Sequence, residues 1–193
     1  MADPPRSASL AAAILAGGAA RRLGGVDKGL ALLQGRPLID WVSAAIAPQV
    51  DEILIIANRH ADEYARYGRV CADRRPGFHG PLEGIATALR ECRSEWLLTV
   101  PVDGPAPGAD LLQQLWRQRG DAAVVVAHDG ARRQPLFALY HCIRVAPPGL
   151  DEDPQQSVWG WQDSYPCIEV DFSASAGRFV NLNTAQDFRD AAF

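Results

Sequence analysis

The chain has 193 residues, of which 48% are hydrophobic and 22% are charged, with a formal net charge of -4. This balance is typical of a globular domain and excludes a disordered chain, and the acidic charge argues against broad binding of nucleic acid. No stretch approaches the roughly 18 unbroken apolar residues of a membrane span, and the four cysteines include no Cys-x-x-Cys pair, which argues against a zinc site and favours a reducing cytoplasm.

Short apolar runs alternate with amphipathic stretches along the chain, which is typical of a parallel sheet covered by helices. We expect a flexible extension over residues 1–9 and one domain over residues 10–193. The apolar residues of each run are consecutive, as in strands that are buried on both faces. The predicted strands are Ala11–Leu15, Glu52–Ala57, Arg69–Ala72, Glu95–Val100, Ala122–His128, Pro135–Tyr140 and Cys167–Phe172.

Helices are predicted between these strands. Apolar residues recur at helical spacing behind Pro37, a residue favoured at the first helical position, and indicate a crossover helix. A last helix begins near Asn183 or Thr184, where Asn183 is a candidate N-cap and Thr184 to Asp187 has capping-box spacing. Three further helices are predicted around residues 61–67, 82–92 and 109–117.

The later part of the sheet contains an antiparallel hairpin, because Asp129-Gly130 between two apolar runs indicates a turn. Residues 146–166, rich in Pro, Gln and Trp, are predicted to form a loop. We therefore expect an α/β fold of Rossmann-like type, with a mostly parallel central sheet, helices on both faces and a late antiparallel portion.

The most informative local feature is the glycine-rich run from Leu15 to Gly29, directly after the first predicted strand. Its glycines allow close approach of the backbone to a ligand, and Arg21, Arg22 and Lys28 supply positive charge, as in a phosphate-binding loop. Gly29 follows Lys28, so the run lacks the Gly-Lys-Ser/Thr of a Walker A motif. Its glycines also lack the G-x-G-x-x-G spacing of a dinucleotide-binding loop.

Asp103 follows the very apolar run 96–102, and ligands of open α/β sheets bind at the carboxyl ends of strands. A carboxylate there can bind Mg²⁺, which is the interpretation we favour; the alternative is an Asp that forms a turn before Gly104-Pro105. Asn58 can read a base edge or ribose hydroxyl, or end a strand. Asp73 precedes a turn, so it can be either a turn residue or a residue with a functional role.

Other candidates also have a structural alternative. Gly80 and Gly84 flank a helix start that favours anions, although Gly84 can equally be a packing contact. Asn181 alternates with Asn183 in an extended segment, so both side chains can face one way. Two tryptophans in the predicted loop, Trp159 and Trp161, can stack on a planar ligand or pack the loop against the domain.

The glycine-rich run resembles a family signature. Leu15-Ala-Gly-Gly, Arg22-Leu-Gly-Gly and Asp27-Lys-Gly are similar to the loop of sugar-nucleotide-type nucleotidyltransferases, and most closely to that of molybdenum cofactor guanylyltransferases. Later motifs follow in the order of that family: Ala57-Asn58-Arg59-His60, Asp73 with Gly80-Pro81-Leu82-Glu83-Gly84, Pro101-Val102-Asp103-Gly104-Pro105, Gln134-Pro135-Leu136-Phe137-Ala138-Leu139 and Asn181-Leu182-Asn183-Thr184. Together these motifs cover most of the chain.

The resemblance implies that the terminal phosphate of molybdopterin attacks the α-phosphate of GTP and expels pyrophosphate. It assigns catalysis to Arg22, Lys28 and Asp103, with Asp103 as the ligand of Mg²⁺, and contacts with the second substrate to Asn181 and Asn183. In related enzymes the second glycine, here Gly18, accompanies the use of guanine, so GTP is expected over CTP. The implied nucleotide-binding residues are Leu15, Ala16, Gly17, Gly18, Gly25, Lys28, Asn58, Asp73, Gly80, Gly84 and Asp103.

Two alternatives stay open. The chain can be a molybdopterin cytidylyltransferase or a nucleotidyltransferase acting on a sugar phosphate. It can also be a non-catalytic protein that binds nucleotide and delivers molybdopterin, because Gln155-Gln156-Ser157-Val158 stands where the family has a basic stretch. The expected partners are GTP and molybdopterin, with transient contact with molybdoenzymes or cofactor chaperones in the cytoplasm, and neither nucleic acid nor a membrane.

Overall fold

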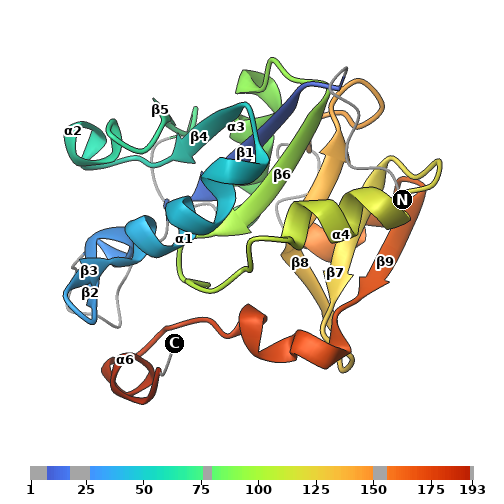
Figure 1. Cartoon of the computed structure of the whole chain (residues 1–193). Coiled ribbons are helices and arrows are strands. Elements are labelled where there is room, and N and C mark those ends of the chain that lie inside the picture. The colour runs from blue at the N-terminus through green and yellow to red at the C-terminus, as the bar shows by residue number, and fades with distance from the viewer. Residues whose placement is uncertain (1–7, 18–26, 76–79, 150–155, 192–193) are drawn as a thin grey trace.

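A computed structural model of the chain describes residues 8–17, 27–75, 80–149 and 156–191 (Figure 1). Its main sheet has the strand order β5-β4-β1-β6-β8-β7-β9. The strands are β1 (Leu10–Leu15), β4 (Glu52–Ile56), β5 (Arg69–Cys71), β6 (Trp96–Pro101), β7 (Val124–His128), β8 (Arg133–His141) and β9 (Cys167–Asp171). All seven predicted strands are therefore present, and their bounds shift by no more than two residues.

The sheet is mixed in the way that the sequence predicts. Strands β5, β4, β1 and β6 are mutually parallel, so their carboxyl ends lie at the same edge. Strand β8 runs antiparallel to β6 and β7, which confirms the hairpin at Asp129-Gly130, and β9 is parallel to β7. The α/β fold with a late antiparallel portion is confirmed.

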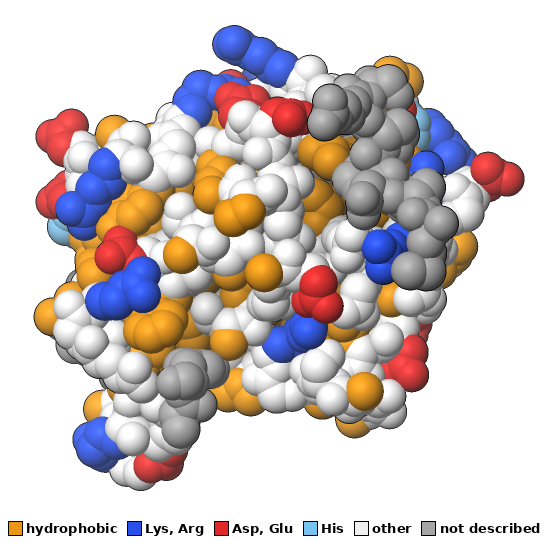
Figure 2. All heavy atoms as spheres, viewed as in Figure 1, with side chains coloured by type: hydrophobic (Ala, Val, Ile, Leu, Met, Phe, Trp, Pro, Cys, Tyr) orange, Lys and Arg blue, Asp and Glu red, His pale blue; other side chains and the backbone are white. Residues whose placement is uncertain are grey.

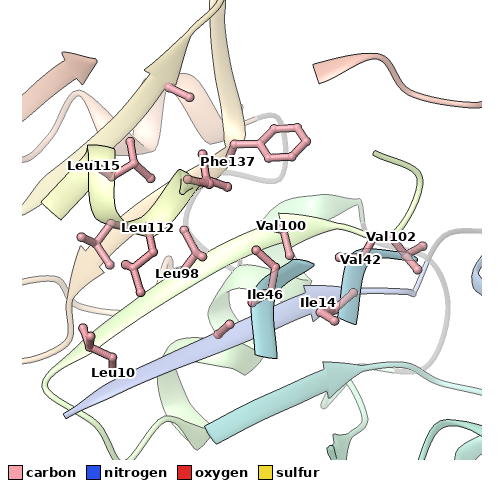
Figure 3. Packing of buried hydrophobic residues seen from close by; sticks show 14 of the residues in the cluster. Leu10, Ile14, Val42, Ile46, Leu98, Val100, Val102, Leu112, Leu115 and Phe137 are labelled. Atoms are coloured by element: carbon pink, nitrogen blue, oxygen red, sulfur yellow. The ribbon is translucent and has the colours of Figure 1, made fainter. Parts of the chain in front are cut away.

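Helices cover both faces of the sheet. The elements are α1 (Leu38–Ile46), α2 (Ala61–Tyr64), α3 (Pro81–Glu91), α4 (Leu111–Gln118), α5 (Val158–Gln162) and α6 (Ala185–Asp190). On one face, Val42 and Ile46 of α1 pack toward Ile14 of β1, and Leu112 of α4 lies near Leu98 of β6 (Figure 3). On the other face, α3 and α5 contribute apolar side chains to a second buried cluster.

Strand β1 shows why its apolar residues are consecutive. Leu10, Ala12 and Ile14 belong to the cluster under α1 and α4, whereas Ala11 and Ala13 belong to the cluster under α3 and α5. Successive side chains of a strand point to opposite faces, so a strand covered on both faces needs an apolar residue at every position.

A third, smaller cluster joins the end of the chain to its beginning. Leu182 packs with Leu33 and Leu38, and Phe188 of α6 packs against the same group. Leu33 lies in a short hairpin formed by β2 (Leu32–Leu33) and β3 (Arg36–Pro37). The C-terminal segment (red in Figure 1) therefore passes along one edge of the sheet and ends beside this hairpin.

Several local expectations differ from the structure. The predicted loop over 146–166 contains the short helix α5, whose Ser157 side chain accepts a hydrogen bond from Gly160 N. The β2–β3 hairpin and the 3-10 turn η2 (Lys28–Leu30) are not predicted from the sequence. Thr184, and not Asn183, is the N-cap of α6, and the predicted capping box with Asp187 is present.

No helix among the described residues is both long enough and apolar enough to cross a membrane. On the face of the molecule shown in Figure 2, acidic and basic side chains lie interspersed, without a continuous basic patch in the described part of that face.

Candidate active site

The candidate residues follow the carboxyl ends of the parallel strands. Gly17 follows β1 and Asn58 follows β4, while Asp73 follows β5 and Asp103 follows β6. Backbone hydrogen bonds continue beyond the strands, because Ala16 N donates to Ile56 O at 2.9 Å. The sheet therefore brings to one edge four motifs that lie far apart in the sequence, and such an edge is where α/β proteins bind ligands.

Asn58 and Asp73 form a reciprocal pair at this edge. Asn58 Nδ2 donates to Asp73 Oδ2 at 2.8 Å, and Asp73 N donates to Asn58 Oδ1 at 2.8 Å. A Cβ on Gly17 would lie 3.6 Å from Asp73 Oδ2 and 3.8 Å from Asn58 Nδ2. Three predicted nucleotide contacts thus lie together, and the absence of a side chain at Gly17 keeps the surface beside the polar pair open.

Thr87 also contacts the Asn58–Asp73 pair, although it is not among the residues predicted from the sequence. Its Oγ1 donates to Asp73 Oδ1 at 2.9 Å from the buried side of α3. Each oxygen of Asp73 therefore accepts one hydrogen bond from the described residues, and a carboxylate oxygen has the capacity to accept a second one from a ligand. Thr87 lies four residues after Glu83 in α3, and both polar side chains are buried; this spacing of polar residues among apolar ones is the signal that could have identified Thr87.

A second group forms around Lys28. Its side chain is 14% exposed, and Nζ lies 2.5 Å from Asp103 Oδ2 and 2.6 Å from Asn183 Oδ1. Lys28 therefore joins the end of β6 to the C-terminal segment. The structure brings together two predicted catalytic residues, Lys28 and Asp103, with one residue that the resemblance assigns to the second substrate.

The backbone around Lys28 is held by Asp27. Its carboxylate caps η2 by accepting from Gly29 N at 3.1 Å, and the buried hydroxyl of Tyr64 donates to the same oxygen. Burial, together with the Asp27 carboxylate, raises the pKa of Tyr64 well above its ordinary value, so the phenol stays protonated and remains a donor.

Gly29 is required by close packing at this turn. A Cβ on Gly29 would lie 2.3 Å from Tyr64 Oη and 3.0 Å from Val102 Cγ2. The Asp27-Lys28-Gly29 motif is therefore explained residue by residue: Asp27 caps the turn, Lys28 reaches Asp103, and Gly29 leaves room for Tyr64.

Asn181 lies next to this second group. Its Oδ1 is 3.4 Å from the position that a Cβ would take on Gly104, the residue after Asp103. Asn181 Oδ1 is buried and has no hydrogen-bond partner among the described residues. A buried polar atom without a partner is costly, so this oxygen is suited to a donor or cation supplied by a ligand.

The structure gives the two glycines of the α3 region different positions. Gly80 precedes α3 with φ +84°, a conformation that other residues rarely adopt, and no atom of the described residues lies within 4 Å of the position of a Cβ there. Gly84 lies inside α3, where a Cβ would be 3.4 Å from Leu15 Cδ2 and 3.6 Å from Ile56 Cγ2. Gly84 thus occupies a packing position between α3 and the sheet, and its role in nucleotide binding stays a prediction.

Part of the predicted loop lies outside the described residues. Gly18, Arg22 and Gly25 fall within residues 18–26, as does Arg21. The predicted roles of Gly18 in base choice and of Arg22 in catalysis therefore remain predictions. Gln155, at the start of the stretch that departs from the family, also lies outside the described residues.

The two tryptophans of the late segment have different environments. Trp161 is 4% exposed and packs with Tyr140 and Tyr165, so it belongs to the core. Trp159 is 45% exposed, and the Arg133 guanidinium lies 5.2 Å from the centre of its ring. Packing is therefore the role of Trp161, while only Trp159 presents an aromatic surface to solvent.

The residues around Asp103 fit a hard divalent cation. Among the described residues, no three His, Cys, Asp or Glu side chains form a ready metal-binding group. Asp103 Oδ2 nevertheless already accepts a cation, the Lys28 ammonium, and the amide oxygens of Asn183 and Asn181 lie nearby. Carboxylate and amide oxygens are the donors that hard divalent cations prefer, and substrate phosphates commonly complete such a site, so these residues fit a cation of this kind.

The comparisons with known proteins agree with this geometry. A family model described as the MobA-like NTP transferase domain matches residues 12–163. A molybdenum cofactor guanylyltransferase of Vibrio vulnificus is 41% identical over 178 residues, which cover 90% of each chain. The enzyme of the same name from Shewanella sediminis is 40% identical over 93% of this chain and 94% of its own length.

Solved structures share the fold. The molybdopterin-guanine dinucleotide biosynthesis protein A from Archaeoglobus fulgidus has a TM-score of 0.74 at 21% identity, covering 93% of this chain and 95% of that one. A nucleotidyl transferase from Methanothermobacter thermautotroptrophicus has a TM-score of 0.69 at 17% identity, covering 94% of both chains.

Proposed function

The chain belongs to the MobA-like NTP transferase family, and from that premise we propose that it is a molybdenum cofactor guanylyltransferase. It transfers GMP from GTP to a molybdopterin-type cofactor and releases pyrophosphate. Relatives that bear this name are 38–41% identical over about nine-tenths of the chain. The product is a guanine dinucleotide form of the cofactor.

The contact between Lys28 and Asp103 is the structural observation that supports this function best. It joins the cationic end of the glycine-rich loop to a carboxylate at the carboxyl end of β6. A cationic loop by itself can only bind a triphosphate. The same loop beside a metal-binding carboxylate can also stabilise the charge that develops when the bond between the α- and β-phosphates breaks.

The chemistry needs positioning and charge neutralisation. An oxygen of the terminal phosphate of molybdopterin attacks the α-phosphorus of GTP, the bond to the bridging oxygen breaks, and pyrophosphate leaves with the electron pair. The attacking group is itself a nucleophile, so no side chain has to form a covalent intermediate. In this proposal Lys28 and Arg22 hold the β- and γ-phosphates, while backbone amides of the glycine-rich loop contact the same groups.

The Asn58–Asp73 pair forms the other end of the nucleotide site in this proposal. Its amide group and its carboxylate offer both donors and acceptors, which suits a ribose hydroxyl or a base edge. Gly17 leaves room for the nucleoside beside the pair. Leu15, Ala16 and Gly18 would contribute backbone groups along the same loop.

The family generally uses a divalent metal, and we propose that it is Mg²⁺ held by Asp103. When bound, the ion supplies positive charge to the phosphate oxygens of the substrate. We also propose that the reaction takes place in the cytoplasm, since all four cysteines are free thiols. The product would then pass to molybdoenzymes or cofactor chaperones by transient contact.

The function is tested by incubating the purified protein with molybdopterin and Mg²⁺ together with GTP or CTP. We expect pyrophosphate release and a product whose mass corresponds to the guanine dinucleotide, with GTP preferred. Parallel reactions with sugar phosphates as acceptors should give no product. A cytidine product, transfer to a sugar phosphate, or binding without pyrophosphate release would each contradict the proposal.

A further inference from the structure

We propose that Asn183 is a positioning residue for Lys28 and therefore acts on the nucleotide half of the site, in addition to any contact with the second substrate. This inference rests on the proposed function. Among the described residues, Lys28 Nζ has two acceptors, Asp103 Oδ2 and Asn183 Oδ1, which are 75 and 155 residues away in the sequence. The C-terminal segment thus supplies one of the two groups that orient this ammonium.

The side chain of Asn183 is available because its neighbours cap the helix. Thr184 is the N-cap of α6, and Asp187 Oδ2 accepts from the backbone N–H groups of Asn183 and Thr184 at 2.6 and 2.7 Å. The backbone of Asn183 is therefore fixed by the capping box, while its amide is left to reach Lys28.

The segment before Asn183 is anchored as well. Leu182 N donates to Asp103 O at 2.9 Å, and the Leu182 side chain is buried against Leu33 and Leu38. One backbone hydrogen bond therefore ties the chain that carries Asn183 to the residue that pairs with Lys28. The distance between the two acceptors of Lys28 is in this way set by the tertiary structure.

A neutral amide is suited to this role. An ammonium has three donors and no acceptor, so its two contacts with the described residues leave a third donor for a phosphate. Asp103 compensates the charge of Lys28, whereas the amide of Asn183 orients the ammonium without adding negative charge beside the triphosphate. Holding a long, flexible side chain in place before the ligand arrives lowers the entropy that binding has to overcome.

The first experiment measures nucleotide affinity in the absence of molybdopterin, where a contact with the second substrate has no effect. We expect Asn183→Ala to weaken the binding of Mg-GTP roughly 3- to 10-fold by titration calorimetry, which is within the range of one ordinary hydrogen bond. Gln186→Ala is the matched control, because Gln186 lies in the same segment, is exposed and bonds only to Asp190 and Arg189 in the contacts described. Unchanged affinity of Asn183→Ala, with a raised KM for molybdopterin alone, overturns the inference.

A double-mutant cycle tests whether Asn183 acts through Lys28. If it does, Asn183→Ala reduces affinity for Mg-GTP in the wild-type background and has no further effect in a Lys28→Ala background. Additive losses would mean that Asn183 contacts the nucleotide independently, and they overturn the inference. Thermal unfolding of each variant separates positioning from damage to the fold, because a positioning role predicts the same Tm for Asn183→Ala and Gln186→Ala.

Failure of the inference is distinguishable from failure of the proposed function. A wild-type protein that binds CTP in place of GTP contradicts the proposed base choice, and the same cycle run with CTP still tests Asn183. A wild-type protein that binds no nucleoside triphosphate overturns both. Guanylyl transfer by the wild type, with nucleotide affinity unchanged in Asn183→Ala, overturns the inference alone.

Discussion

At the scale of single residues, Lys28 and Asp103 form the pair on which the proposed chemistry depends. We expect Lys28→Ala and Asp103→Ala each to lower kcat by about 10²-fold or more, the size of effect seen when a group that stabilises transition-state charge is removed. Neither side chain belongs to the apolar clusters, and they are 14% and 19% exposed, so both variants should fold. Steady-state kinetics compares the kcat of each variant with that of the wild type, and circular dichroism checks that the variant is folded. Near-normal turnover in either folded variant would rule out the assigned role of that residue.

Gly29 is a residue whose importance comes from packing. In Gly29→Ala the new Cβ would lie 2.3 Å from Tyr64 Oη, and Tyr64 is fully buried and bonded to Asp27. We expect this variant to lose about 1–3 kcal/mol of unfolding free energy, as overpacked sites do, and to lose activity because the turn that carries Lys28 must shift.

Chemical denaturation measures this loss, and Gly177→Ala is the matched control, since a Cβ at Gly177 meets nothing within 4 Å. Equal stability of the two variants would show that the turn accommodates a side chain. A stability loss in Gly29→Ala with unchanged kcat would instead separate the packing of the turn from the position of Lys28.

At the scale of elements, α6 shows how a short helix can serve a distant site. Its capping box fixes Thr184 and the backbone of Asn183, while Phe188 packs against the cluster of Leu33 and Leu38. A six-residue helix has little stability by itself. We infer that α6 is held in place by its cap and by this apolar contact, and that the orientation of Asn183 depends on both.

The cap makes the order of α6 depend on pH. Hydrogen bonds from the backbone of Asn183 and Thr184 lower the pKa of Asp187 below its ordinary value of 3.8. A carboxylate whose pKa is lowered by folding contributes to the stability of the folded state. This contribution is fully present above the pKa of the unfolded chain and is lost as the pH falls through the pKa of the folded state. In the wild type, we expect the protection of the α6 amides from hydrogen exchange to decrease as the pH falls below 3.8. The Asp187→Asn variant should show no such decrease.

The strands and most helices could be predicted because their signals are local. Strand β1 needs an apolar residue at every position, and Thr184 with Asp187 has the spacing of a capping box. Helix α5 could not be predicted in the same way, because five residues are too few to show a helical period. Its burial comes from contacts of Trp161 with Tyr140 and Tyr165, which only the folded chain brings together.

At the scale of the whole molecule, nucleotide binding should stabilise the fold. A ligand that binds only the native state at 100 times its Kd adds about 2.7 kcal/mol, which corresponds to a rise in Tm of about 5 to 11 °C for a protein of this size. We expect this rise with GTP and Mg²⁺, a smaller one with CTP or ATP at the same concentration, and loss of most of it when a chelator removes the metal. Differential scanning fluorimetry measures the four conditions together. An equal rise with CTP would contradict the preference for guanine.

The order of the strands, the α/β class and the motifs of the family can be read from short stretches of sequence, because burial on both faces and phosphate binding each require a pattern within a few residues. How those motifs combine depends on contacts between residues that are far apart in the chain. The parallel strands place Asn58 beside Asp73, and Lys28 reaches an aspartate 75 residues away and an asparagine 155 residues away. Local spacing does not show whether the Asn183 side chain caps a helix or contacts Lys28, since an amide can do either. In the structure Thr184 is the cap, and Asn183 Oδ1 accepts from Lys28 Nζ.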